Sequence, residues 1–145
     1  MSATDLSRSL LDEAIVLATD AHRGQVDKAG AAYILHPLRV MLAQSDDVRR
    51  IAAVLHDVVE DCDVTPDAIR ARFGDVVADA VVALTRRDDE DYAAFVARCA
   101  ENPVARDVKR ADIADNMDLS RPSIVGERDR DRVAKYRRAL AWLDA

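Results

Sequence analysis

The chain has 145 residues, of which 50% are hydrophobic and 33% charged, and its formal net charge at pH 7 is −6. This is typical of one soluble globular domain, so residues 1–145 are taken as a single domain, and collagen-like or disordered chains are excluded. The acidic balance argues against nucleic-acid binding, and no apolar run approaches the roughly 18 residues of a membrane span. Cys62 and Cys99 do not make a disulfide framework, and the first residues lack an apolar signal core, so a cytoplasmic protein is expected.

Apolar residues recur at helical spacing in the first half of the chain. The stripe over residues 10–21 predicts a first helix, and residues 24–33, which include two glycines, predict a loop. The proline directly after His36 suits the first turn of a second helix. Ser45 is expected to cap a third helix that runs to about Asp61.

The second half of the chain is also expected to be helical. Further helices are expected over residues 66–74, 75–85, 91–100, 103–119 and 129–143, with a loop over 122–126. Four valines leave a strand as the alternative for residues 75–85. Because no alternating pair of strands joined by a turn appears, the sequence predicts an all-α fold, with seven or eight short helices in one bundle-like domain.

The sharpest chemical feature is the run HDVVED at residues 56–61. Asp57, Glu60 and Asp61 share one face if this run is helical. Crowded carboxylates beside the imidazole of His56 repel one another unless positive charge lies among them. A divalent ion would supply that charge, and imidazole with carboxylate suits Mn, Fe, Co or Zn. The alternative is an acidic, solvated end of a helix.

His36 and Asp112 could complete a ligand set with His56 and Asp57. The order is His, then His-Asp, then Asp, from three predicted helices, which would leave coordination positions open to water and substrate. Taken singly, His36 and Asp112 each have a structural alternative. The third histidine, His22, lies near the end of the first helix, where a structural role is expected.

Four segments of the chain resemble the HD-type hydrolase domain of RelA/SpoT enzymes. Their sequences are AHRGQ (21–25), YILHPLRV (33–40), AVLHDVVED (53–61) and VKRAD (108–112), the last followed by Asn116 and Met117. They occur in the family's order, and the likeness covers residues 9–119. The chain therefore resembles a small stand-alone hydrolase of the alarmone (p)ppGpp.

This resemblance implies the all-helical HD fold and a role for each matching residue. The residues that would bind a divalent metal, usually Mn²⁺ in this family but with another divalent transition metal as an alternative, are His36, His56, Asp57 and Asp112. Glu60 and Asp61 would form the acid/base pair beside the attacking water, and Asn116 would help to hold substrate or water. The reaction would remove pyrophosphate from the ribose 3′ position of (p)ppGpp, giving GDP or GTP.

Four further residues are candidates for contacts with the nucleotide. Arg23, Lys28 and Lys109 are the best candidates for binding phosphate charge, and Tyr33 could line the base or ribose pocket. Each also has a purely structural alternative. The basic residues could be solvated surface cations, and Tyr33 could pack within its loop.

The chain departs from the family at positions expected to face the substrate. In the long enzymes a basic pair precedes the loop glycine, and its arginine packs against guanine, whereas this chain has Asp27 and then Lys28. A carboxylate cannot stack on a purine as a guanidinium can. Asp115 stands where a histidine is common, and Asp118 and Leu119 stand where arginine and threonine are frequent. These changes remove positive charge and one hydroxyl from the expected substrate side.

Three functions are consistent with these residues. The first is a Mn²⁺-dependent (p)ppGpp 3′-pyrophosphohydrolase, and the second is an HD phosphohydrolase of another nucleotide, for example of the 2′-phosphate of NADPH. The third is a non-catalytic HD domain that binds a nucleotide or a partner protein, against which the presence of Glu60 and Asp61 argues. A small-molecule nucleotide is the expected partner, and composition leaves a homo-oligomer open.

Overall fold

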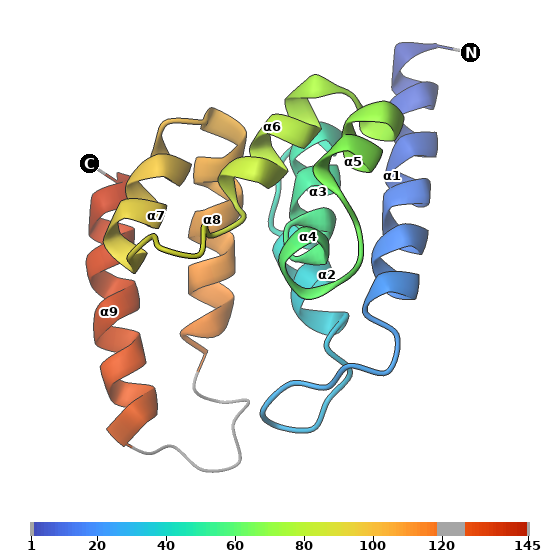
Figure 1. The fold of residues 1–145 in the computed structure, drawn as a ribbon. Helices are drawn as coiled ribbons and strands as arrows, with labels where there is room; N and C mark the ends of the chain where they lie inside the picture. The colour runs from blue at the N-terminus through green and yellow to red at the C-terminus, as the bar shows by residue number, and fades with distance from the viewer. Residues whose placement is uncertain (1, 119–126, 145) are drawn as a thin grey trace.

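The all-α fold is confirmed by a computed structural model, which describes residues 2–118 and 127–144 (Figure 1). The helices in this part of the chain are α1 (Ala3–Ala21), α2 (Leu35–Leu42), α3 (Asp47–Leu55), α4 (Val58–Asp61), α5 (Pro66–Phe73), α6 (Asp75–Ala83), α7 (Tyr92–Ala100), α8 (Pro103–Asn116) and α9 (Glu127–Asp144). The same residues contain no strand, only one isolated antiparallel bridge between Val26 and Ala32 in the loop after α1.

Most helix starts follow from capping residues in the sequence. Side chains of Thr65, Asp91 and Asn102 accept hydrogen bonds from backbone N–H groups in the first turns of α5, α7 and α8, and these helices begin as expected. The segment from Asp75 is a helix, so the strand alternative is wrong. Helix α8 ends at Asn116, short of the expected end, and the loop expected over residues 122–126 lies outside the described residues.

The prediction for the third helix is wrong in two respects, the capping residue and the position of the helix end. Asp46, not Ser45, caps α3, because its side chain accepts a hydrogen bond from the backbone N–H of Arg49. The helix does not run on to residue 61 but stops at Leu55, and α4 begins two residues beyond His56. This break divides the expected third helix in two, so the described residues contain nine helices when the four-residue α4 is included.

The core is built around α3 and α8. In Figure 1, α1 and α9 lie on opposite sides of the molecule, with α3 and α8 between them. Helix α3 packs against α1, α2, α6 and α8, and α8 also packs against α7 and α9. Residues 51–55 are all buried, so the end of α3, where His56 and Asp57 follow, is fixed inside the protein. No helix among the described residues is long and apolar enough to cross a membrane.

Candidate metal centre

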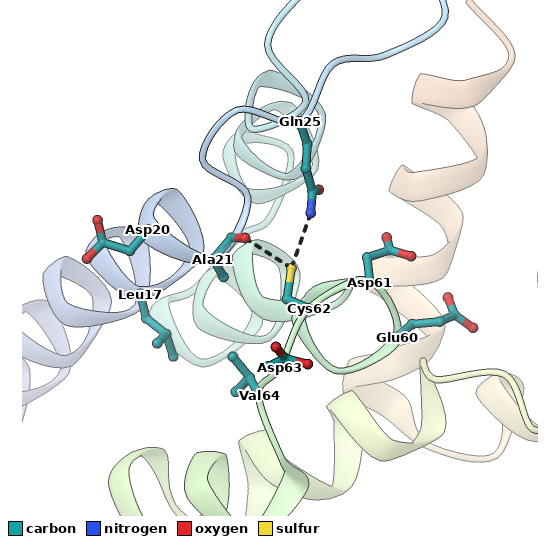
Figure 2. Close-up of a pocket in the computed structure, with 9 residues that line it drawn as sticks. All are labelled: Leu17, Asp20, Ala21, Gln25, Glu60, Asp61, Cys62, Asp63 and Val64. Atoms are coloured by element: carbon teal, nitrogen blue, oxygen red, sulfur yellow. Dashed lines mark hydrogen bonds between the residues drawn. The ribbon is translucent and has the colours of Figure 1, made fainter.

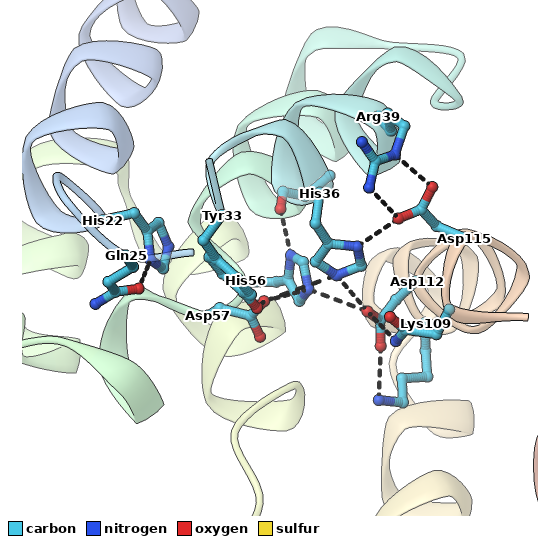
Figure 3. A network of polar contacts seen from close by, with 12 residues as sticks. His22, Gln25, Tyr33, His36, Arg39, His56, Asp57, Lys109, Asp112 and Asp115 are labelled. Carbon is cyan, nitrogen blue, oxygen red and sulfur yellow. Dashed lines mark hydrogen bonds and ion pairs between the residues drawn. The ribbon is translucent and has the colours of Figure 1, made fainter. Parts of the chain in front are cut away.

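Three separate elements bring two imidazoles and two carboxylates together (Figure 3). His36 comes from the first turn of α2, His56 and Asp57 from the break between α3 and α4, and Asp112 from α8. Possible ligand atoms of His36, His56 and Asp112 all lie within 4.8 Å of one another. The Oδ2 atom of Asp57 lies 3.0 Å from Nε2 of His56 and 3.8 Å from Nε2 of His36. The structure thus gathers the four residues expected to be ligands.

The break after α3 gives His56 its orientation. Its Nδ1 atom lies 2.5 Å from the carbonyl oxygen of Ala53, which can only accept, so Nδ1 carries the proton. The other nitrogen, Nε2, is buried and has no hydrogen-bond partner, although carboxylate oxygens of Asp57 and Asp112 lie 3.0 and 3.3 Å away. A buried nitrogen that faces two carboxylates without a hydrogen bond is what converging metal ligands require, so this donor set fits a divalent cation.

The cluster demands positive charge at its centre. Burial works against charged imidazoles, but the hydrogen bond that His36 donates to Asp112 raises the pKa of His36, and the charge of Asp57 raises that of His56 well above its usual value. Burial also works against an ionised Asp112, yet the ammonium of Lys109, 2.9 Å away, lowers the pKa of that carboxyl well below its usual range. Either imidazole protons or a divalent ion can neutralise the buried carboxylates.

Glu60 and Asp61 stand where the cluster opens to solvent. Both line a cavity of about 270 Å³ together with His36, Asp57 and Asp112. The backbone N–H of Arg86 donates to Oε1 of Glu60 at 3.0 Å and so fixes this carboxylate. Burial, followed by the charge of Asp57, raises the pKa of Asp61, and the same two causes raise that of Glu60 against the hydrogen bond from Arg86. A raised pKa makes a carboxyl group a better proton acceptor, as a general base requires.

A second cavity adjoins the acid pair on the side of α1 (Figure 2). Its volume is about 630 Å³, and Glu60 and Asp61 line it as well. The thiol of Cys62 turns inward and donates to the carbonyl of Ala21 at 3.3 Å. The side-chain amide of Gln25 in turn donates to the sulfur at 3.7 Å. The acid pair therefore separates two water-accessible spaces.

The expected nucleotide-binding residues fall into two groups. Tyr33 and Asn116 touch the cluster, because the Tyr33 hydroxyl donates to Asp57 at 2.5 Å and the Asn116 amide donates to Asp112 at 3.3 Å. Both also line a neighbouring cavity of about 320 Å³ with the exposed Lys28. Burial and then Asp57 raise the pKa of Tyr33, so its hydroxyl keeps its proton and remains a donor.

Two other basic residues are engaged elsewhere. Lys109 is buried, pairs with Asp112, and lies 4.6 Å from the ring centre of Phe95. Arg23 pairs with Asp20 at 2.6 Å on an exposed surface. Their assignment to phosphate binding stays a prediction, and Lys109 already has a partner within the metal cluster.

The sequence did not predict the contact of His36 with Asp115, or that of Asp115 with Arg39. Oδ2 of Asp115 lies 2.6 Å from its Nδ1 atom, and Arg39 holds the same carboxylate through two hydrogen bonds of 2.7 and 3.1 Å. A signal was present, since Arg39 follows His36 by three residues and Asp115 follows Asp112 by three, which places each pair on one helix face. His22 is buried too, and its Nδ1 atom lies 2.9 Å from Oε1 of Gln25, which agrees with a structural role.

Comparison with known families supports the chemical interpretation of this cluster. A family model described as an HD domain matches residues 14–124. The chain belongs to the HD domain family. The matched stretch of this HD domain contains all four clustered residues as well as Glu60 and Asp61. HD domains bind a divalent metal, and His36, His56 and Asp112 can hold one here.

Relatives of this HD domain include large alarmone enzymes. It is 42% identical over 82 residues to a guanosine-3′,5′-bis(diphosphate) 3′-pyrophosphohydrolase of Vibrio cholerae, covering 54% of this chain and 12% of the relative. It is 34% identical over 119 residues to the Aquifex aeolicus enzyme of that name, covering 74% of this chain and 17% of the relative. The HD domain described here therefore spans less than a fifth of these relatives.

A solved structure resembles the HD domain over nearly its whole length. It is a metazoan ortholog of SpoT, described as hydrolysing ppGpp and as having a role in starvation responses. The TM-score is 0.76 at 25% sequence identity, and the match covers 99% of this chain and 86% of the other. The expected resemblance to the HD domain of RelA/SpoT enzymes is thus confirmed.

Proposed function

We propose that this protein is a metal-dependent hydrolase that removes pyrophosphate from the ribose 3′ position of (p)ppGpp, leaving GDP or GTP. The observation that carries the proposal is the shared cavity, in which the acid pair Glu60 and Asp61 adjoins the cluster of His36, Asp57 and Asp112. A module that only binds nucleotides needs no such acid pair. The names of the relatives and of the structural neighbour support this substrate class.

The metal in this proposal is Mn²⁺, and its ligands are His36, His56, Asp57 and Asp112. When bound, a divalent ion lowers the pKa of water and adds positive charge beside the attacked phosphate. The protein's own contribution is to keep both imidazoles oriented with Nε2 toward the carboxylates, as the hydrogen bonds of Nδ1 on His36 and His56 do. Another divalent transition metal with the same ligand preferences would also suit the set.

Glu60 and Asp61 carry the proton transfers in this scheme. One carboxylate takes a proton from the attacking water while the new bond forms between the water oxygen and the phosphorus attached to the 3′ oxygen. The bond between that phosphorus and the 3′ oxygen breaks, pyrophosphate departs, and the other carboxyl group of the pair, in its protonated form, gives its proton to the ribose oxygen. The raised pKa of both carboxyl groups brings them closer to the operating pH, where such transfers are most efficient.

Contacts with the nucleotide are assigned mainly to residues around the 320 Å³ cavity. Tyr33, Lys28 and Asn116 line the 320 Å³ cavity beside the cluster and are proposed to hold the ribose and phosphates. Lys109 is proposed to act on phosphate only indirectly, through Asp112. Arg23 would have to leave Asp20 before it could reach a substrate.

A second substrate is favoured by one observation at Asp27. Its Oδ1 atom accepts from the backbone N–H groups of Ala29 and Ala31, both at 2.9 Å. The carboxylate is thereby fixed in the wall of the 320 Å³ cavity, where the resemblance would place an arginine stacked on guanine. A nucleotide other than the guanine alarmone, such as one with a ribose 2′-phosphate, is therefore the second candidate.

A release assay with metal-free protein tests the proposal. ppGpp, pppGpp, their adenine counterparts, NADPH and simple mononucleotides are incubated with and without Mn²⁺. We expect Mn²⁺-dependent formation of GDP and pyrophosphate from ppGpp. The double variant Glu60→Gln, Asp61→Asn should lose activity by about 100-fold or more, as removal of general acid/base groups does.

Asp63→Asn is the matched control, because Asp63 is a neighbouring exposed carboxylate that lines the 630 Å³ cavity on the side of α1 and not the 270 Å³ cavity at the cluster. It should keep its activity. Turnover of NADPH alone would reassign the substrate, and hydrolysis of ppGpp by the double variant at the unaltered rate would refute the assigned acid/base roles.

A further inference from the structure

Asp115 is the one carboxylate that contacts both a proposed metal ligand and a guanidinium in the described cluster. Its Oδ2 atom lies 2.6 Å from Nδ1 of His36, and Arg39 donates to Oδ1 from Nε at 2.7 Å and to Oδ2 from its terminal nitrogen at 3.1 Å. The side chain of Asp115 is only 11% exposed. This arrangement is visible at the upper right of Figure 3.

The contact decides which nitrogen of His36 faces the cluster. An ionised carboxylate only accepts hydrogen bonds, so Nδ1 of His36 must carry the proton in this contact. The other nitrogen, Nε2, then points to Oδ1 of Asp112 at 2.9 Å and toward Asp57 at 3.8 Å. A hydrogen bond at one ring nitrogen that fixes the other toward a metal is the usual support of a ligating histidine.

Arg39 gives the support its rigidity. Two parallel N–H···O contacts hold a carboxylate in one plane more firmly than a single contact does. They also balance the charge of Asp115, so this carboxylate does not compete with Asp57 and Asp112 for a cation at the centre. Arg39 and His36 lie one turn apart on α2, while Asp115 and Asp112 lie one turn apart on α8.

We propose that Asp115, clamped by Arg39, is a positioning residue that orients the His36 ring for metal binding and so raises the affinity of the centre for its metal. The inference rests on the proposed function only in that His36 is taken as a metal ligand. It gives a function to a position where the sequence suggested merely a loss of positive charge from the substrate side.

The test is calorimetric titration of the metal-free, full-length protein with Mn²⁺ and no nucleotide. Asp115→Ala should weaken Mn²⁺ binding about 10- to 100-fold, as loss of such supporting contacts typically does. Arg39→Ala, which leaves the carboxylate beside His36 but removes its guanidinium partner, should weaken binding less. Asp115→Asn keeps an acceptor for the His36 N–H and should recover part of the affinity. The double variant Arg39→Ala, Asp115→Ala should be no weaker than Asp115→Ala alone, because the two residues act as one unit.

Asp107→Ala is the matched control. Asp107 lies on the same helix and forms an ion pair of 2.7 Å with Arg49 outside the cluster, so this variant should bind Mn²⁺ like the parent. Circular dichroism melting identifies any variant that does not fold, in which case Arg39→Ala and Asp115→Asn carry the test. Mn²⁺ affinities of folded Asp115 and Arg39 variants within twofold of the parent would overturn the proposal, as would a parent that binds no Mn²⁺. Because no nucleotide is present, failure of ppGpp hydrolysis leaves this result unaffected.

Discussion

Lys109 shows how a single residue can be assigned two opposite roles. A lysine that binds substrate phosphate would have an exposed ammonium with no protein partner before substrate arrives. The structure instead buries the ammonium of Lys109 against Asp112 at 2.9 Å and close to the ring of Phe95. Burial disfavours its charge, yet the charge of Asp112 raises the pKa of Lys109 above its usual value. The ammonium of Lys109 thus neutralises a buried carboxylate inside the protein.

Lys109→Met should therefore destabilise the metal-free protein. The substitution removes the ammonium that is paired with the buried carboxylate of Asp112, and loss of one partner from a buried ion pair usually costs about 3–5 kcal/mol. Urea unfolding followed by circular dichroism measures it. Lys28→Met is the matched control, since Lys28 is exposed and surface substitutions stay within about 0.5 kcal/mol. Equal stability of the two variants would return Lys109 to the set of free phosphate ligands.

At the same scale, the sequence indicates the residues of the candidate centre but not the residues that support them. His36, His56, Asp57 and Asp112 carry a donor chemistry that the sequence displays directly, and the structure gathers them. Spacing places Asp115 on the same helix face as Asp112, but it does not show that Arg39, which lies 76 positions away in sequence, neutralises it. Pairings across helices depend on tertiary packing, which spacing along one chain does not reveal.

At the scale of elements, the helical spacing of apolar and acidic residues over 47–61 does not predict the break between α3 and α4. Residues 51–55 are continuously apolar, and the next turn carries its carboxylates at helical spacing, so the pattern favours one unbroken helix. The structure instead lets Ala53 accept a hydrogen bond from the ring of His56. The break therefore accompanies the orientation of His56. The local pattern of polar and apolar residues does not predict this break.

The cap of α3 offers a direct test at this scale. Asp46 accepts from the backbone N–H of Arg49 at 2.8 Å and also pairs with its guanidinium. Asp46→Ala should lower the free energy of unfolding by about 1 kcal/mol, the usual cost of losing an N-cap. Ser45→Ala, at the exposed position where the sequence suggested the cap, should change it by less than about 0.5 kcal/mol. Chemical denaturation distinguishes the two, and the reverse order would restore Ser45 as the cap.

At the scale of the whole molecule, the candidate metal centre connects helices that are far apart in sequence. Its residues come from α2, from the α3–α4 break and from α8, and α2, α3 and α8 all pack against one another. A cation bound at this junction would bind the folded chain but not the unfolded one. Its affinity would therefore add to the stability of the entire fold.

This coupling makes the stabilisation by metal depend on pH. His36 and His56 have raised pKa values in the folded protein, so their stabilising contribution is complete below the unfolded value of about 6.5 and is lost as pH rises through the raised values. Asp57 and Asp112 have lowered pKa values, so their contribution is present above the unfolded value of about 3.9 and is lost only as pH falls through the lowered ones. Without metal, stability should therefore decline on the alkaline side.

Mn²⁺ should reverse this decline, because it binds imidazoles that have lost their protons. Calorimetric melting from pH 6 to pH 8.5 should show a lower Tm at higher pH in EDTA, and a rise in Tm on adding Mn²⁺ that grows with pH. At a free Mn²⁺ concentration 100 times Kd the gain is about 2.7 kcal/mol. A rise that shrinks toward pH 8.5 would contradict the assignment of the two histidines as ligands, because protons and metal would then not compete for the same nitrogen atoms.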